Sequence, residues 1–514
     1  MTRFIKLLYS NRLFGLILIL IQLFLIAAVC VWLSDYAYYV YLATIVLSAV
    51  LIIYEINRQE EPGFKLTWIM LISVIPIFGA VLYLFLHNNR IARKIIINSK
   101  EVKSRIVPYT KQDNDVRTAL KSEFPGEVGI SEYLYNNSQF PTYYNDSVKY
   151  FPIGEDMFAD LKNELRSAKD FIFIEMFIIN PNGKMWPEIL DILTEKAKSG
   201  VEVRLMYDGM GCMTLLKSDY PEYLESLGIK CKIFSPIVPL FSTYQNNRDH
   251  RKIVIVDGRA AFTGGINFAD EYINEIVRFG HWKDNGIKII GNSVSEYTAM
   301  FLQMWNTFAV KISYDDYKKY ISKTYDYKYE IGEGFVIPFA DSPYTLDRVG
   351  ENLYLNNINS ANEYVHIMTP YLVLGSNMIE ALKFAAKRGV DVCIILPHIP
   401  DKPYAFWLAG TYYRELISAG VKIYEYEPGF VHAKMSISDG KRAIVGTMNH
   451  DYRSLYLNYE CAAYLIGVPQ INEMEEDFQK TLRSCIHVSI EDYQKRSILK
   501  RCAGRIIRLV APLL

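Results

Sequence analysis

The sequence predicts an α/β protein in which two similar α/β repeats pack about a pseudo-twofold axis, preceded by an N-terminal transmembrane helical region. Long uncharged stretches occur near the N-terminus, a strand–helix–strand pattern occurs twice in the remainder, and one set of polar residues recurs at the same spacing in both copies. We therefore expect a membrane region in residues 1–95, a linker and entry segment in 96–149, a first repeat in 150–330 and a second in 331–514.

Three uncharged stretches are long enough to cross the roughly 30 Å hydrocarbon core of a bilayer as helices. Leu13 to Leu33 has 21 residues, Tyr36 to Tyr54 has 19 and Leu66 to Leu86 has 21. The first is too long for a signal peptide, and further apolar stretches follow it at once. A multi-pass membrane protein is therefore expected, with the alternative that one or more of these stretches is a buried helix of a soluble domain.

The basic residues near these stretches do not agree on one orientation. Arg3, Lys6 and Arg12 place the N-terminus in the cytoplasm, so three crossings would put everything after Leu86 outside. The following segment, NNRIARKIIINSK, is equally basic and indicates the cytoplasm. One stretch that does not cross would reconcile the two signals. We expect the part after the membrane region to be cytoplasmic, and the number of crossings stays open.

The composition excludes several classes of function. The 514 residues carry 56 basic and 56 acidic side chains, so the net charge is zero. With neither a basic excess nor a basic aromatic stripe, the sequence does not predict a nucleic-acid partner. The seven cysteines are scattered without a CxxC pair, which argues against a zinc site or a disulfide framework. The oligomeric state is not indicated.

The region after residue 150 contains two copies of one strand–helix–strand unit. In the first copy a strand at 171–180, a helix at 186–200 and a strand at 201–209 are expected, and in the second a strand at 364–373, a helix at 377–389 and a strand at 390–397. The phrases AKSGVEVRLM and AKRGVDVCII join helix to strand in the two copies. A strand–helix–strand unit implies parallel strands, so two copies predict a duplicated α/β architecture.

A five-residue pattern follows each unit. A lone His-x-Lys is usually a surface pair, whereas a pattern of five residues repeated at the same offsets is specific. Alternatives are a metal site or a structural strand end, and the duplication argues against both. The remaining histidines lack such support and are expected to be structural or exposed. The first copy has His250, Lys252, Asp257, Gly264 and Asn267, the second has His432, Lys434, Asp439, Gly446 and Asn449, and the remaining histidines are His281, His366, His398, His450 and His487.

This pattern predicts a site for a phosphoryl group. Side chains two apart on a strand share a face, so each His projects with its Lys, and a pseudo-twofold axis would bring the two pairs together across one cleft. One imidazole can attack phosphorus while the other protonates the departing oxygen. Lysines and asparagines can hold the other oxygens, so we expect neither a metal nor a cofactor. Asp257 and Asp439 lie an odd five positions after Lys252 and Lys434 and are interpreted as structural charge partners.

The duplicated HxKx4D motif resembles the signature of the phospholipase D superfamily, and the flanking phrases resemble bacterial cardiolipin synthases. These phrases include PGFKLTWIMLISVIPIFGAVLYLFL, NNRDHRKIVIVDGRAAFTGGINFADEY and GTMNHDYRSLYLNYE. The resemblance implies that His250 is the nucleophile, that His432 is the acid–base partner, and that Asp284 and Glu460 orient the two imidazoles. It also implies phosphatidyl transfer between two phosphatidylglycerol molecules, giving cardiolipin and glycerol. The stretch from Leu13 to Leu33 is an addition to the usual pattern of this family.

The same motifs are compatible with other functions. The same chemistry with water as acceptor would make a membrane phospholipase D that produces phosphatidic acid. An inactive membrane scaffold is disfavoured because both motifs are intact, and a nuclease because the charge is neutral. The C-terminal segment 495–514 carries six basic residues among Ile and Leu. It either lies on an anionic membrane surface rich in phosphatidylglycerol or packs as a helix on the catalytic core.

Overall fold

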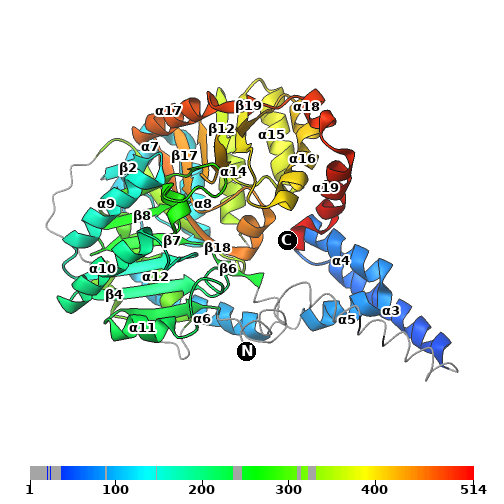
Figure 1. Cartoon of the computed structure of the whole chain (residues 1–514), viewed down its shortest axis with the longest axis horizontal. Helices are drawn as coiled ribbons and strands as arrows, with labels where there is room; N and C mark the ends of the chain where they lie inside the picture. The colour runs from blue at the N-terminus through cyan, green and yellow to red at the C-terminus, as the bar shows by residue number, and fades with distance from the viewer. Residues whose placement is uncertain are drawn as a thin grey trace. The chain divides into compact units, whose positions relative to one another are not determined.

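The protein is described by a computed structural model over residues 20, 24, 36–86, 90–145, 147–235, 246–308, 314–321, 332–345 and 347–513 (Figure 1). The chain forms two compact units, which are described separately. The N-terminal unit comprises residues up to Arg90 together with 237–246 and 512–514, and the main unit comprises 91–236 and 247–511.

Both predicted strand–helix–strand units are present in the main unit. In the first, β3 (Phe171–Met176) and β4 (Glu202–Asp208) are parallel and joined through α10 (Met185–Lys198). In the second, β12 (Tyr364–Met368) and β13 (Asp391–Pro397) are parallel and joined through α15 (Ser376–Lys387). The predicted type of every element is confirmed, although β3 and β12 end four or five residues earlier than expected from 171–180 and 364–373.

The two repeats build sheets with the same strand order. Within the described residues the first sheet runs β2-β10-β8-β7-β3-β4-β5, and the second contains the corresponding path β11-β18-β17-β16-β12-β13-β14, extended by β1 and β19 at its edges. The remaining strands of the first sheet are β2 (Ser147–Phe151), β5 (Lys230–Phe234), β7 (Lys252–Val256), β8 (Ala260–Gly264) and β10 (Gly286–Ile290). Those of the second are β1 (Tyr143–Tyr144), β11 (Phe335–Asp341), β14 (Lys422–Tyr426), β16 (Met435–Ser438), β17 (Arg442–Gly446), β18 (Asn458–Ile466) and β19 (Cys485–His487), and β6 (Arg248–Asp249) pairs with β18.

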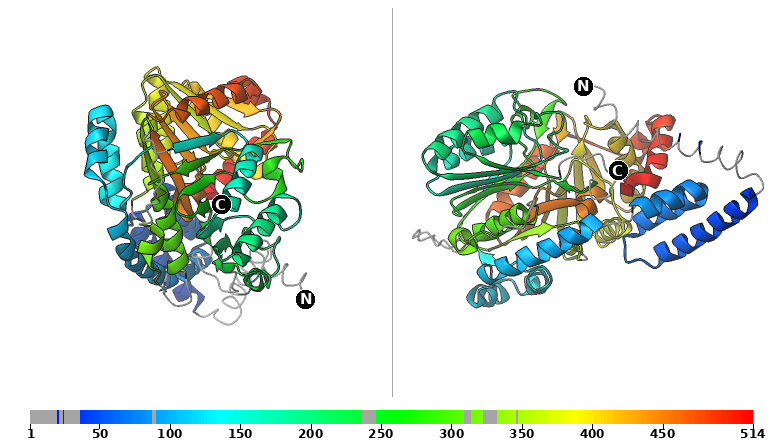
Figure 2. Two further views of the ribbon diagram at one scale, coloured as in Figure 1. Left: turned by 90° about the vertical axis from the view of Figure 1, so that its left-hand side faces the viewer. Right: turned by 90° about the horizontal axis from the view of Figure 1, so that it is seen from below.

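Helices cover both sheets, and the sheets meet each other along β8, β10, β17 and β18 (Figure 2). Because both faces are covered, the central strands are buried along their whole length: all five residues of β7 and all nine of β18 are buried. The covering helices are α9 (Gly154–Ser167), α10 and α12 (Val294–Thr307) in the first repeat, and α14 (Val349–Asn359), α15, α16 (Pro403–Ser418) and α17 (Gln470–Leu482) in the second.

The segment expected to be a linker and entry segment carries regular structure. Residues 96–149 include most of α6 (Arg90–Ile106), together with α7 (Asn114–Glu123) and α8 (Val128–Ser138). They end with β1 and β2, which join different sheets: β1 pairs with β11 of the second sheet and β2 pairs with β10 of the first. This stretch therefore ties the two repeats together.

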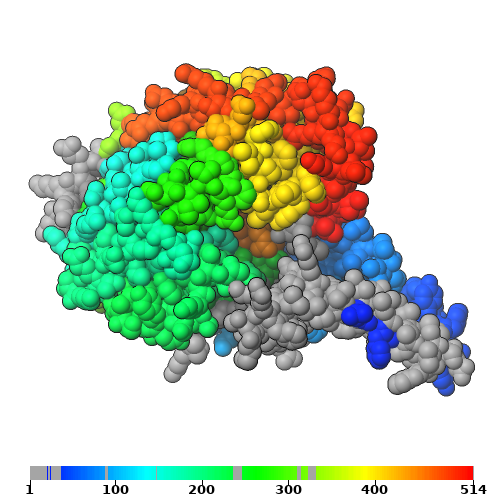
Figure 3. All heavy atoms as spheres, viewed as in Figure 1, coloured from blue at the N-terminus to red at the C-terminus, as the bar shows by residue number. Residues whose placement is uncertain are grey.

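The C-terminal segment contains a helix that packs on the main unit. Helix α19 (Ile498–Val510) lies along α16, and a Cβ atom added at Gly504 would overlap the Trp407 carbonyl oxygen (Figure 1). Arg508 lies over the Tyr412 ring, 4.3 Å from its centroid. The outer face of α19 is exposed and apolar, as Ile498, Leu499 and Ile506 are more than half exposed, and in Figure 3 the C-terminal helices (red) lie on the molecular surface.

The N-terminal unit contains α3 (Ala37–Ile56), α4 (Pro62–Val74) and α5 (Pro76–Leu86). Among the described residues, α3 is the one helix long and apolar enough to cross a membrane, and it matches the predicted stretch from Tyr36 to Tyr54. The predicted stretch from Leu13 to Leu33 lies outside the described residues apart from Leu20 and Phe24.

The prediction of one continuous helix from Leu66 to Leu86 is wrong. The helix stops at Ile75, whose φ of −131° and ψ of 72° are not helical, because Pro76 disfavours the helical conformation in the residue before it. The chain then reverses direction: a Cβ atom at Gly79 would lie 2.6 Å from the Leu71 carbonyl oxygen. Hydropathy alone could not separate this helical hairpin from a single span.

Side chains fix the position of this hairpin against α3. The Tyr83 hydroxyl donates to Glu55 Oε2 at 2.5 Å, so α5 returns to the end of α3 from which the chain enters α4. At the other end of the hairpin, Ser48 Oγ lies 3.5 Å from the Pro76 carbonyl oxygen. Ser48 lies eight residues before Ile56, at about 1.5 Å per residue, so the hairpin tip is about 12 Å along α3.

Candidate active site

The two His-Lys pairs occupy equivalent places in the two sheets. His250 directly follows β6 and lies two residues before β7, and His432 directly follows the short strand β15 (Gly429–Val431). Each is held by the backbone of a distant segment: His250 N donates to the Tyr459 carbonyl oxygen at 3.0 Å, and His432 N to that of Lys283 at 2.6 Å. The two histidines are buried, with exposed fractions of 8% and 7%.

Each imidazole is paired with a carboxylate from the other repeat. His250 Nδ1 lies 2.9 and 3.0 Å from the two oxygens of Glu460, which belongs to β18. His432 Nδ1 lies 2.6 Å from Oδ2 of Asp284, between β9 (His281–Lys283) and β10. Such a reciprocal exchange is what a twofold arrangement of repeats produces. A carboxylate at Nδ1 fixes the tautomer and leaves Nε2 as the nitrogen that can react.

Both carboxylates are positioned by further groups. Glu460 accepts hydrogen bonds from the Thr447 hydroxyl and from Asn458 Nδ2. Asp284 accepts from the backbone N–H of Asn285 at 2.9 Å. The equivalent of Thr447 in the first repeat is Gly265, where a Cβ atom would overlap the Asp284 carboxylate, so only glycine fits. Sequence reasoning missed this pair, although both residues directly follow the repeated glycine.

Burial controls the charge state of the two imidazoles. Burial lowers the pKa of His250 to about 4, with Lys252 adding to the effect and Glu460 opposing it. Burial, with the charge of Lys434, lowers the pKa of His432 to about 3, against the opposing effect of Asp284. Both imidazoles are therefore neutral at pH 7. A bound phosphodiester would raise the pKa of both imidazoles, because a nearby negative charge favours the protonated form.

The two lysines are equally buried. Lys252 Nζ donates to the His250 carbonyl oxygen at 2.7 Å, and Lys434 Nζ donates to that of His432. Burial lowers the pKa of Lys252 to about 8 and that of Lys434 to about 7. The charge of each lysine also acts on the imidazole of the other pair, so the four side chains form one electrostatic cluster.

The two predicted asparagines differ in their partners. Asn267 Oδ1 accepts from the Ile178 backbone N–H at 3.1 Å, and its Nδ2 donates to the Tyr272 hydroxyl at 2.6 Å. Asn449 is 5% exposed, and its Oδ1 has no hydrogen-bond partner within the described part of the chain. The amide of Asn267 is therefore occupied by protein groups.

Asp257 and Asp439 lie at the opposite ends of the motif strands from the histidines. The Asp257 carboxylate accepts three backbone N–H hydrogen bonds, at 2.7 to 2.8 Å, from Lys169, Asp170 and Phe171. Asp439 accepts three equivalent bonds, at 2.8 to 3.0 Å, from residues 362–364. Each holds the start of the neighbouring strand, β3 or β12, against the turn that ends its own strand. This geometry supports a structural role rather than contact with the reacting group.

Aromatic rings surround the histidines. The rings of Tyr272, Trp282 and Phe430 lie 5.4, 5.3 and 5.9 Å from the His432 ring, centroid to centroid. The Phe177 ring meets the His250 ring edge to face at 4.9 Å. Sequence analysis identified none of these rings, because they come from separate segments without a shared motif. They give each imidazole an apolar side in addition to its charged neighbours.

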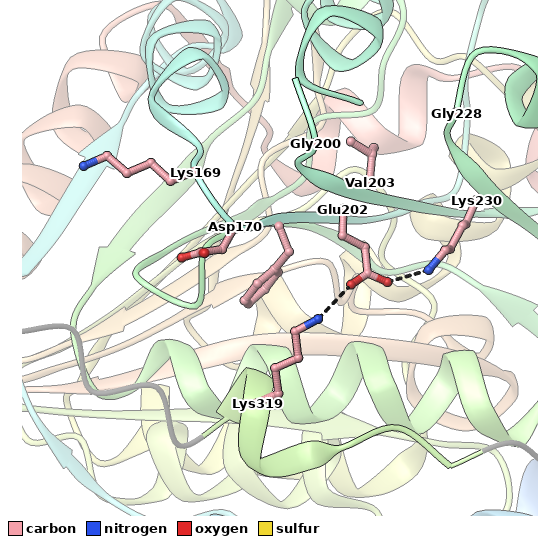
Figure 4. A pocket seen from close by; sticks show the side chains of 9 residues that line it. Lys169, Asp170, Gly200, Glu202, Val203, Gly228, Lys230 and Lys319 are labelled. Atoms are coloured by element: carbon pink, nitrogen blue, oxygen red, sulfur yellow. Dashed lines mark hydrogen bonds and ion pairs between the residues drawn. The ribbon is translucent and has the colours of Figure 1, made fainter. Parts of the chain in front are cut away.

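Two further findings concern possible ligand sites. Among the described residues, no group of three or more His, Cys, Asp or Glu side chains is placed to hold a metal ion. A hollow of about 460 Å³ lies at the end of the first sheet where Asp257 accepts its backbone hydrogen bonds, away from the histidines (Figure 4). Its Glu202 is paired with Lys230 at 2.7 Å and with Lys319 at 3.4 Å, so these charged groups are already engaged with one another.

We predict that Asp257→Ala lowers the free energy of unfolding by about 2–4 kcal/mol, because three backbone N–H groups lose their acceptor together. Asp257→Asn should cost less, since one acceptor oxygen remains and asparagine tolerates the positive φ of 56°. Denaturant unfolding of the detergent-solubilised protein measures this, with Asp391→Ala, at an exposed ion pair with Lys422, as the control. Wild-type stability of Asp257→Ala would rule out the structural role.

Comparisons with known proteins agree with this architecture. A family model described as cardiolipin synthase, PLD-like domain, matches residues 161–305 and 354–482, and a phospholipase D-nuclease N-terminal model matches 44–86. An uncharacterised protein of Streptococcus mutans is 45% identical over 90% of this chain and 99% of its own length. A cardiolipin synthase of Clostridium perfringens is 35% identical over 89% of this chain and 95% of its own length.

A crystal structure of phosphatidylserine synthase from Haemophilus influenzae matches 75% of this chain and 98% of its own, with a TM-score of 0.56 and 12% identity, which supports the fold alone. The family matches cover both repeats, and the sequence relatives extend over nearly the whole chain. The chain belongs to the cardiolipin synthases, phosphatidyltransferases of the phospholipase D superfamily.

Proposed function

We propose that this chain transfers a phosphatidyl group from one phosphatidylglycerol to another, forming cardiolipin and glycerol through a covalent phosphohistidine. The observation that carries the proposal is the pair of buried imidazoles, each bound through Nδ1 to a carboxylate of the other repeat. Two such groups beside two buried lysines can supply a nucleophile, an acid–base group and stabilising charge. The 35% identical relative named a cardiolipin synthase supports the choice of lipid.

In the first half-reaction, Nε2 of His250 attacks the phosphorus of phosphatidylglycerol. The phosphorus–oxygen bond to the terminal glycerol breaks, and His432, which takes up a proton at Nε2 when the phosphodiester binds, gives that proton to the departing glycerol oxygen. Lys252 and Lys434 stabilise the charge that develops on the remaining oxygens. The family resemblance supports His250, rather than His432, as the nucleophile.

In the second half-reaction, a hydroxyl of the terminal glycerol of a second phosphatidylglycerol attacks the phosphohistidine. His432 takes the hydroxyl proton, the nitrogen–phosphorus bond breaks, and the new phosphodiester completes cardiolipin. Water would give phosphatidic acid instead. The low exposure of both histidines and the aromatic rings around His432 support an alcohol acceptor, because they limit the access of water to the intermediate.

We predict that purified protein with phosphatidylglycerol vesicles and EDTA produces cardiolipin and glycerol in equal amounts. His250→Ala and His432→Ala should each lower turnover by about 10³-fold or more, because solvent cannot replace either role. Mass spectrometry of lipids and an enzymatic glycerol assay measure both products. Phosphatidic acid as the main product would make the protein a hydrolase, and near-normal turnover of either variant would exclude the two-histidine mechanism.

The lysines predict an alkaline limit to activity. Their pKa values, lowered to about 8 for Lys252 and about 7 for Lys434, mean that each is charged below its own pKa and loses its proton as the pH rises through it. We expect kcat/KM to fall above pH 7–8. In Lys434→Arg, the pH above which kcat/KM falls should be higher, since a guanidinium stays charged. A pH profile from 5.5 to 9.5 measures this, with exposed Lys149→Arg as control; an unchanged alkaline limit would contradict the assignment.

For the membrane region, we propose that α3 crosses the bilayer and that α4 and α5 form a hairpin entering and leaving at one face. Helix α4 has 13 residues and α5 has 11, about 20 and 17 Å long, so neither spans 30 Å. The Glu55–Tyr83 hydrogen bond supports the return of the chain to its side of entry. With the expected crossing at 13–33, the main unit would then be cytoplasmic, which agrees with the basic segment after α5.

The outer face of α19 supports contact with an anionic membrane surface. Ile498, Leu499 and Ile506 are 68%, 82% and 67% exposed, and Lys500 and Arg505 are exposed among them. An apolar face bordered by basic residues suits a helix that lies in the headgroup region. Its other face packs on α16, so the two alternatives left open by the sequence are compatible. We propose that this face directs the main unit to membrane rich in phosphatidylglycerol.

We predict that cysteines at positions 59 and 100 face the same side of the membrane. Gln59→Cys and Lys100→Cys, each exposed, should react with a membrane-impermeant maleimide only after the cells are opened, because both positions are cytoplasmic. Val74→Cys, near the hairpin tip, should remain unlabelled in the bilayer. A background with exposed Cys502 replaced by Ser removes a competing thiol. Labelling of 59 and 100 from opposite sides would show that 62–86 crosses the membrane.

A further inference from the structure

The two halves of the candidate site differ at two equivalent positions. Two residues before the motif histidine, the first repeat has Arg248 and the second has Phe430. Four residues after the motif asparagine, the first repeat has Glu271 and the second has Arg453. Phe430 belongs to the aromatic group around His432. One half of the site is therefore aromatic, and the other has an arginine from each repeat.

Arg248 is buried without a hydrogen bond for the end of its side chain. It is 4% exposed, and neither Nη1 nor Nη2 has a hydrogen-bond partner within the described residues. The nearest carboxylate oxygen, Oδ1 of Asp208, is 3.6 Å from Nη1. That carboxylate already accepts from the backbone N–H groups of Met210, Gly211 and Asp249, at 2.7 to 3.0 Å. Two guanidinium nitrogens are thus left with unused donors.

Arg453 carries a second positive charge, close enough to Arg248 for the two charges to act on each other. It begins the short helix Arg453–Leu457 of the second repeat, and burial lowers its pKa, with the charge of Arg248 adding to the effect. The opposing carboxylate of Asp451 accepts from the Ser454 backbone N–H at 2.7 Å, and burial raises its pKa. Arg453 is partly exposed, whereas Arg248 is buried.

The arginine pair is next to the reacting site. Arg248 and His250 are two residues apart on the segment that pairs with β18, so their side chains leave the backbone on the same side. Asn458, opposite Arg248 in that pairing, donates to Glu460, the carboxylate partner of His250. A ligand group bound by Arg248 would therefore lie close to the His250 imidazole.

A phosphate ester is the ligand group that this pair fits. Guanidinium groups offer paired N–H donors that match two oxygens of a phosphate and keep their charge when buried. Lys252 and Lys434 serve the phosphorus that reacts, whereas the unused donors of Arg248 can bind a second phosphate. Cardiolipin synthesis brings a second phosphate to the site. The acceptor phosphatidylglycerol carries its own phosphodiester, separated from the attacking hydroxyl by the three carbons of the glycerol.

We propose that Arg248 and Arg453 bind the phosphate of the acceptor phosphatidylglycerol and so select a phospholipid, rather than water or a free alcohol, as acceptor. This inference rests on the proposed function. The bound phosphate takes no part in the bond changes: the acceptor hydroxyl attacks the phosphohistidine, its proton goes to His432, and the second phosphodiester is unchanged. The arginines are binding residues for the second half-reaction.

Comparing two reactions of the enzyme distinguishes binding of the acceptor phosphate from a role in folding or at the reacting phosphorus. Cardiolipin formation needs the acceptor phosphate. Exchange of deuterated glycerol into phosphatidylglycerol uses the same phosphohistidine and both histidines, but its acceptor has no phosphate. We expect Arg248→Gln and Arg453→Gln each to lower cardiolipin formation by about 30-fold, as expected for loss of a buried charged contact, while glycerol exchange changes less than about threefold. The phosphatidic acid share should rise, since the intermediate waits longer for its acceptor.

The measurement is mass spectrometry of both products with full-length protein in phosphatidylglycerol vesicles. Arg248→Lys should recover part of cardiolipin formation, because a positive charge remains. Arg259→Gln is the control, since Arg259 pairs with Glu164 at the far end of the first sheet and should affect both reactions equally or not at all.

A parallel fall of both reactions in the arginine variants would overturn the inference, because it would mean a role in folding or at the reacting phosphorus. Unchanged cardiolipin formation would overturn it as well. If the wild-type protein exchanges glycerol but makes no cardiolipin, the proposed function fails, and this outcome is visible before any variant is made.

Discussion

The exchange of carboxylates between the repeats is the interaction on which the rest of the site depends. Glu460 of the second repeat holds His250 of the first, and Asp284 of the first holds His432 of the second. Neither repeat alone contains a complete imidazole–carboxylate pair. The junction of the two sheets along β8, β10, β17 and β18 must therefore form before either histidine is held in a defined orientation.

The same constraint explains the burial around the site. Three ionisable side chains in each half, a histidine, a lysine and a carboxylate, are nearly inaccessible to water, and burying such groups is costly unless they are paired. Gly265 and Thr447 show how closely the surroundings fit, since one leaves room for a carboxylate and the other donates a hydrogen bond to one. The cost of burying the two lysines is reflected in their lowered pKa values, and a bound phosphate would offset it.

Much of this arrangement could be predicted from the sequence, for physical reasons. The parallel strands were predictable because their apolar runs and the glycines after their helices are local signals. The two His-Lys pairs stood out because duplication distinguishes them from chance. Asp284 and Glu460 came only from a family resemblance, since a partner in the other repeat leaves no local pattern. Arg248 was not identified, because a single arginine near other charges carries no signal until its missing hydrogen bonds are seen.

The membrane region shows the opposite case. The apolar run from Leu66 to Leu86 satisfied every composition rule for a span, yet Pro76 and the close approach allowed by Gly79 turn it into a hairpin. Hydropathy measures the environment of a segment, and it does not measure the path of the chain through that environment. The Glu55–Tyr83 hydrogen bond, between residues 28 apart, records that path.

Joining both repeats in one chain has a consequence for how the cleft can evolve. Two copies of a single-repeat protein could build the same reciprocal pairs, but every substitution would then appear on both sides of the cleft. Covalent fusion removes that symmetry. Arg248 could be introduced opposite an aromatic Phe430, and Gly265 opposite Thr447, without a matching change in the other half. An enzyme that must treat two chemically identical lipids differently, one as donor and one as recipient, needs an asymmetry of this kind.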